Sequence, residues 1–114
     1  MSSNYSSVEI SILAKQGFVE YNNNNRNEAK NILIKVYREI KSNPKHLKNI
    51  SDLEMLGKCF LVLLDLQISD DIDVLQTIVS IGYFCTSKTI ERNKQIIYPY
   101  QDRLLLLQIG HNAF

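Results

Sequence analysis

The 114-residue sequence contains few of the residues that interrupt helices, with only four glycines and two prolines. So few breakers in a chain of this length favour long helices over many short strands. An excess of one charge sign is also lacking. The formal net charge is +1, too small for the overall field to attract nucleic acid, an anionic membrane or an acidic substrate. The length fits a single domain over residues 1–114.

Cysteine is scarce as well. Cys59 and Cys85 each lie in an apolar run, and neither belongs to a Cys-x-x-Cys or Cys/His cluster. We expect two buried, reduced thiols, with a disulfide between them as the alternative. The N-terminus lacks the basic and apolar regions of a signal peptide, and the stretch CFLVLLDLQI is shorter than a membrane span of roughly 20 residues. These absences favour a soluble, cytoplasmic protein that does not contact membranes.

Patterns typical of catalytic or metal sites are missing. His46 and His111 are the two histidines, and neither has a ligand at the spacing of a known zinc motif. We expect His46 to be solvated in a basic loop and His111 to be packed or frayed. Asp70, Asp71 and Asp73 lack the rest of a calcium loop and fit better as helix caps. The sequence therefore predicts a protein that is not an enzyme and has no cofactor or metal.

Helical periodicity is abundant, and it predicts a first helical hairpin over residues 7–43, after a frayed segment at 1–6. Four asparagines at 22–25 separate its two helices. Asparagine tolerates the left-handed conformation that ends helices and caps the start of helices well. The run therefore predicts a tight corner with Asn25 as an N-cap, and a disordered spacer is the alternative. The two apolar faces comprise Ile10, Leu13, Ala14, Gly17, Phe18 and Tyr21, then Ala29, Ile32, Leu33, Val36, Tyr37 and Ile40.

A second helical hairpin is predicted over residues 51–97. Ser51 and Glu54 have capping-box spacing at its start. Its first helix is apolar over most of its circumference and should be the most buried. Ser69 or Asp70 is the expected cap of its second helix, and IERNKQII either continues that helix or forms a separate turn. The apolar faces comprise Leu53, Leu56, Gly57, Phe60, Leu61, Leu63 and Leu64, then Ile72, Val74, Leu75, Ile78, Val79, Ile81, Gly82 and Cys85.

A C-terminal helix is predicted over residues 100–114, so the expected fold is all-α, with about five antiparallel helices. This last helix is apolar nearly all round and must be buried on several sides. It either folds over the core or pairs with another chain, or the sequence is a fragment that lacks the next helix. Self-association, as a homo-oligomer or within a larger assembly, is therefore an alternative function. Its candidate residues are Leu104, Leu105, Leu106, Leu107 and Ile109.

The stretch AKQGFVEYNNNNRNEAKNILIKV resembles a tetratricopeptide repeat. Gly17 and Ala29 match two small residues twelve positions apart in that repeat, where they let the helices cross closely. Glu20 departs from the pattern, which has an aromatic there, and Val36 stands where a second alanine is usual. LEMLGKCF resembles the first helix of a second unit, at a period longer than the standard one. The resemblance implies an α-α superhelix, and a right-angled helical bundle is the alternative.

The tetratricopeptide resemblance implies a non-catalytic module that binds a protein or peptide on the concave face made by the first helix of each hairpin. The candidate partner-binding residues are Glu20, Asn24, Lys58 and Tyr100. Two basic clusters, within residues 35–48 and 88–94, are the features that would suit nucleic acid. We expect them to be solvated helix ends, because lysine and arginine are favoured near helix C-termini.

Overall fold

The computed structural model describes residues 5–96, with side chains described for residues 5–93. This part of the chain is all-α, as predicted. Its helices are α1 (Ser7–Asn22), α2 (Arg26–Ser42), the one-turn α3 (His46–Asn49), α4 (Leu53–Asp65) and α5 (Ile72–Ile96). Four of them match predicted helices, whereas α3 lies where the sequence predicts a loop. The predicted helix over 100–114 lies outside the described residues.

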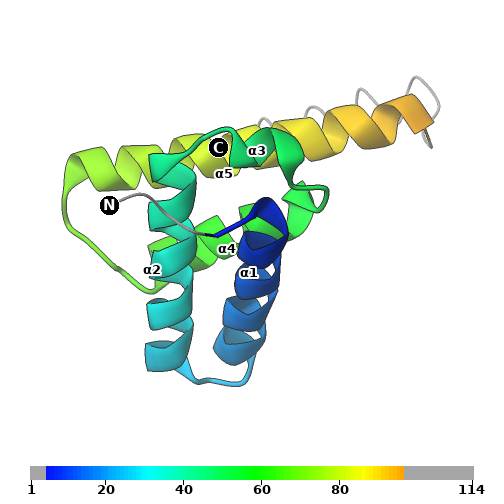
Figure 1. The fold of residues 1–114 in the computed structure, drawn as a ribbon. Helices are drawn as coiled ribbons and strands as arrows, with labels where there is room; N and C mark the ends of the chain where they lie inside the picture. The colour runs from blue at the N-terminus through cyan, green and yellow to red at the C-terminus, as the bar shows by residue number, and fades with distance from the viewer. Residues whose placement is uncertain (1–4, 97–114) are drawn as a thin grey trace.

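The helices form two hairpins that dock through their first helices. α1 and α2 lie side by side and antiparallel, and α5 runs crosswise above them (Figure 1). α4 packs against α5 and also against α1, with a smaller contact to α2. IERNKQI belongs to α5, which continues without a break to Ile96. The prediction that the two hairpins repeat as tetratricopeptide units stays a prediction.

A capping box starts α1. The Ser6 hydroxyl accepts a hydrogen bond from the Glu9 backbone N–H at 3.1 Å, and the Ser6 N–H donates to the Glu9 carboxylate at 2.9 Å. The hydrogen bond from the Ser6 backbone lowers the pKa of Glu9. The prediction that residues 1–6 are frayed is therefore wrong for Ser6, because the Ser-x-x-Glu pattern fixes that residue in place.

The asparagine run forms the predicted corner. Asn24 has a φ of 66°, in the left-handed region. Its N–H donates to the Tyr21 carbonyl at 3.1 Å, and the Asn25 N–H donates to the Glu20 carbonyl at 2.9 Å. These two bonds make a Schellman motif. Asn25 is the N-cap of α2, as predicted, but its side chain donates to the Glu20 carboxylate rather than capping the helix.

The start of α4 differs from the predicted one. Its N-cap is Asp52, whose Oδ1 accepts a hydrogen bond from the Met55 N–H at 3.0 Å. The predicted capping box of Ser51 and Glu54 is therefore wrong. A carboxylate caps as well as a hydroxyl does, and its charge also suits the positive end of the helix dipole.

The start of α5 is also displaced from the prediction. Asp71 precedes the helix, and its Oδ1 accepts a hydrogen bond from the Asp73 N–H at 2.8 Å. The expected cap, Ser69 or Asp70, is therefore wrong. The Ser69 hydroxyl instead accepts from the Asp71 N–H at 3.0 Å, which shapes the connection before the cap.

The core gathers apolar side chains from both hairpins, and α4 contributes more of them than any other described helix, as predicted. Three residues of the predicted apolar faces, Leu61, Ile72 and Val79, are exposed instead. They lie at the edges of their faces, where none of the described helices covers them. The buried members include Ile10, Ala14, Ala29, Leu33, Val36, Ile40, Leu53, Leu56, Cys59, Phe60, Leu63, Ile78 and Cys85.

Two glycines allow close contacts between helices. A methyl group added at Gly17 would lie 2.5 Å from Cδ2 of Leu33, and one added at Gly57 would lie 3.2 Å from Cβ of Cys85. Real Cβ contacts are almost never as short as the first distance. Gly17 thus permits the close crossing expected of a small residue, although Leu33 rather than Ala29 is its nearest contact.

A polar cluster joins the first corner to the end of α4. The Tyr21 hydroxyl donates to Oδ2 of Asp65 at 2.6 Å, and Arg26 forms an ion pair with the same oxygen at 3.3 Å. The hydrogen bond from Tyr21 and the nearby guanidinium lower the pKa of Asp65, and the same hydrogen bond raises the pKa of Tyr21. The cluster is solvent-exposed, so we expect it to orient the hairpins more than it stabilises them.

Candidate functional site

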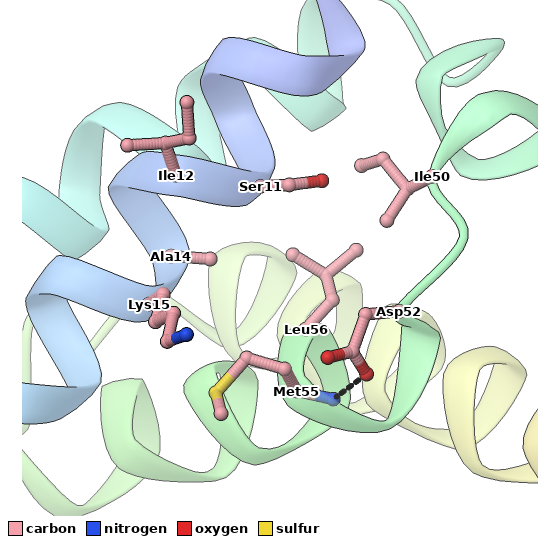
Figure 2. Close-up of a pocket in the computed structure, with 8 residues that line it drawn as sticks. All are labelled: Ser11, Ile12, Ala14, Lys15, Ile50, Asp52, Met55 and Leu56. Atoms are coloured by element: carbon pink, nitrogen blue, oxygen red, sulfur yellow. Dashed lines mark hydrogen bonds between the residues drawn. The ribbon is translucent and has the colours of Figure 1, made fainter.

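A groove of about 200 Å³ lies between α1 and the start of α4 (Figure 2). We call it the α1–α4 groove. Most of the side chains around it are apolar, and two charged ones complete it. Its lining residues are Ser11, Ile12, Ala14, Lys15, Ile50, Asp52, Met55 and Leu56.

The floor of the groove is part of the core, because Ala14, Ile50 and Leu56 are all buried. The small side chain of Ala14 lets α4 approach α1. The Cys59 thiol of α4 donates to the Ala14 carbonyl at 3.1 Å, which adds a direct bond between the two helices. Burial raises the pKa of Cys59 to about 12, so the thiol keeps the proton that it donates. The floor is therefore held by both hairpins together.

Charges of opposite sign stand on the two sides of the groove. Figure 2 shows Lys15 on the α1 side and Asp52 on the α4 side, with Met55 and Leu56 between them. One oxygen of Asp52 is engaged by the Met55 N–H at the start of α4. Lys15 is exposed, and within residues 5–93 it belongs to neither of the two ion pairs. Asp52 is exposed too and neither ion pair includes it, so the groove offers a positive charge on its α1 side and a negative charge on its α4 side.

An exposed apolar stripe runs along α1 beside the groove. It consists of Val8, Ile12 and Val19, which are 70%, 52% and 46% exposed. Their spacing of four and seven residues places them on one face of the helix. We call them the α1 stripe. Ile12 also lines the groove, so the stripe adjoins the groove at that residue, with Lys15 between Ile12 and Val19 on the same face.

None of the four predicted partner-binding residues lines this groove. Glu20 is half-buried at the end of α1 and accepts the hydrogen bond from Asn25, while Asn24 shapes the corner. Lys58 is exposed on α4, one turn after Met55. Tyr100 lies outside the described residues. Of the three described residues, only Lys58 lies on α4, the helix that carries Met55.

The five predicted self-association residues lie outside the described residues. They are Leu104, Leu105, Leu106, Leu107 and Ile109. The α1 stripe beside the groove carries one signal that the sequence offered. Val8, Ile12 and Val19 repeat at helical spacing on the side of the helix away from Ile10, Ala14 and Gly17. One apolar face is enough to pack α1 against the core. A second apolar face on the opposite side of the helix therefore points to exposed apolar surface.

His46 is buried rather than solvated, which corrects the prediction. It begins α3 with 7% of its surface exposed, and its Nδ1 lies 2.8 Å from the Ser7 hydroxyl of α1. The loop before α4 folds into a helical turn that turns the imidazole inward. Among the described side chains no carboxylate hydrogen-bonds to His46, so this pair lacks the third member of a catalytic triad.

The second basic cluster is partly engaged within the chain. Lys88 forms an ion pair with Glu91 at 3.4 Å, and Nη1 of Arg92 donates to the Ser51 carbonyl at 3.1 Å. In the first cluster, Lys41 lies over the Tyr37 ring at 5.9 Å. These contacts tie basic side chains to their own helices and to the start of α4.

The two cysteines are buried and unpaired, as predicted. Burial also raises the pKa of Cys85 to about 12.

Comparison with protein-family models, curated proteins and solved structures finds no match to this chain. No helix in residues 5–96 combines the length and apolarity that crossing a membrane needs.

Proposed function

We propose that the protein is a non-catalytic binding module that holds a segment of a protein or peptide partner in the α1–α4 groove. The observation that carries the proposal is the exposed α1 stripe, which adjoins the groove at Ile12. Exposed apolar surface of this kind, next to a concave site with a few polar groups, is typical of interaction sites.

Two features of the groove support the proposal. Its floor consists of core residues from both hairpins, so a ligand would meet a preformed surface. The α1 stripe is exposed, and burying half of a valine or isoleucine side chain is worth about 1 kcal/mol. Three such side chains would together contribute about 3 kcal/mol, which corresponds to roughly a hundredfold in Kd.

The test is a selection of binders from a random library of 14-residue peptides displayed on phage. We expect the selected peptides to bind the Ile12→Ser variant at least about tenfold more weakly than the native protein. Leu61→Ser is the matched control, since Leu61 is 50% exposed on α4 but does not line the groove. Peptides that lose affinity equally on both variants, or on neither, would contradict the proposal.

Self-association through residues 100–114, which the sequence predicts to be helical, stays the alternative, and the run of four leucines at 104–107 favours it. Light scattering at low and high protein concentration separates the two proposals. A monomer at both concentrations argues against the alternative. A dimer that dissociates in the Leu106→Asp variant would place the interface on residues 100–114 instead of on the groove.

A further inference from the structure

We infer that the occupant of the α1–α4 groove is an amphipathic helix of another protein, about three turns long, with a carboxylate near its centre. This inference rests on the proposed function and names the chemistry of the partner. It follows from the length of the α1 stripe, the kind of surface that the helices offer, and the position of Lys15.

The length of the partner helix is inferred from the length of the α1 stripe. Val8 and Val19 are eleven residues apart, which corresponds to about 16 Å along a helix, or three turns. A partner helix laid along α1 would meet Val8, Ile12 and Val19 with anchors at similar spacing, the mode by which amphipathic helices bind apolar grooves. The described residues contain no strand, and therefore no sheet edge to which an extended peptide could add.

The negative charge of the partner helix is inferred from the position of Lys15. It lies three residues after Ile12 and four before Val19, on the same face and near the middle of the stripe. It is exposed and forms no ion pair with a described residue. Lys58 adds a second positive charge one turn beyond Met55 on the α4 side. A carboxylate on the α1 side of the partner, away from Asp52, would complement Lys15.

A second copy of this chain fits the stripe poorly. In a two-fold pairing of α1 with itself, Val8 would face Val19 of the other copy, so the axis would pass midway between positions 8 and 19. In this register Lys15 would face Ile12 of the other copy, so the two lysines would lie within one turn of each other, about 4.5 Å apart along the helix, and each would be set against an apolar side chain. Like charges this close oppose association, so the stripe suits a different, acidic partner.

The experiment uses peptides from the random 14-residue library that require Ile12. We expect them to be enriched in aspartate or glutamate between apolar anchors and to gain helical circular dichroism on binding. Lys15→Glu should weaken their binding about fivefold, and the same variant should prefer peptides in which the central acid is replaced by lysine. Lys35→Glu, an exposed change on α2, is the matched control and should leave both affinities unchanged.

The outcomes separate the two proposals. Ile12-dependent peptides without acidic enrichment, or without a change of preference in Lys15→Glu, would overturn the acidic helix while keeping the groove. Selection that yields no Ile12-dependent peptide would overturn the proposed function and this inference with it. A dimer in light scattering that Ile12→Ser disrupts would show that a second copy is the occupant and would also overturn the inference.

Discussion

The two hairpins differ in how tightly their helices are joined. α1 and α2 are linked by a Schellman corner at residues 23–25, and Gly17 lets Leu33 approach so closely that no side chain would fit between them. α4 and α5 are linked by the longer segment 66–71, and Gly57 meets Cys85 at a looser distance. The first hairpin is thus fixed by backbone geometry, and the second mainly by a broad apolar interface.

The largest effect on stability is expected from adding a methyl group where the two helices of the first hairpin come closest. Gly17→Ala would place a methyl group 2.5 Å from the fully buried Leu33. Overpacking of this kind costs about 1–3 kcal/mol, against about 1 kcal/mol that alanine gains over glycine in a helix. We expect a net loss of stability of up to about 2 kcal/mol in urea unfolding.

The equivalent change in the second hairpin is the control. Gly57→Ala would meet Cys85 at 3.2 Å, so a shift of a few tenths of an ångström relieves the contact. We expect its effect on stability to stay within about 1 kcal/mol of zero. Equal losses in the two variants would show that the hairpins are packed alike.

Alkaline pH should lower the stability of the second hairpin, because that hairpin contains both cysteines. The folded thiols have pKa values of about 12, against an ordinary value of 9.0. A raised pKa contributes stability that is complete below pH 9 and is lost as the pH rises toward 12. The free energy of unfolding should therefore fall by up to about 1.4 kcal/mol per pH unit for each cysteine.

Urea unfolding between pH 8 and 10.5 measures this loss. Cys85→Ala should show a shallower decline than the native protein, since lysine and tyrosine titrate in both and cancel in the difference. Parallel pH profiles would mean that Cys85 ionises as readily in the folded protein as in the unfolded chain.

The smallest effects are expected at the two helix ends. Gln67 follows α4 with a φ of 51°, a conformation that glutamine adopts at a cost and glycine adopts freely. Gln67→Gly should raise stability by about 0.5–1 kcal/mol, visible as a higher Tm. Asn24→Gly should gain less, because asparagine already tolerates its φ of 66°. A larger gain at Asn24 would reverse the ranking of the two corners.

The sequence predicted the first hairpin well because local signals dominate there. Asparagine tolerates the left-handed conformation and caps helices, and Ala29, Leu33, Val36, Tyr37 and Ile40, which are all buried, repeat at helical spacing. The helix starts at 52 and 71 were misplaced because adjacent serine and aspartate residues are equally good caps in sequence. Tertiary packing then decides which of them is used.

The candidate site was harder to predict because it depends on two hairpins docking. Ile12 and Met55 come together only through the packing of α1 on α4, which no local pattern encodes. His46 shows the same effect, since its burial results from the contact of α3 with Ser7. The spacing of the α1 stripe is present in the sequence. The same helix also carries the apolar face that packs into the core, and spacing alone does not tell which apolar residues stay exposed.

The location of the groove at the junction of the two hairpins has a thermodynamic consequence. A ligand seated there binds only the docked arrangement, so it would shift the equilibrium between docked and separated hairpins toward the docked one by mass action. Saturation at one hundred times Kd corresponds to about 2.7 kcal/mol. The amide protons of α1 and α4 would then exchange more slowly with solvent, and binding anywhere in the groove would be reported along both helices.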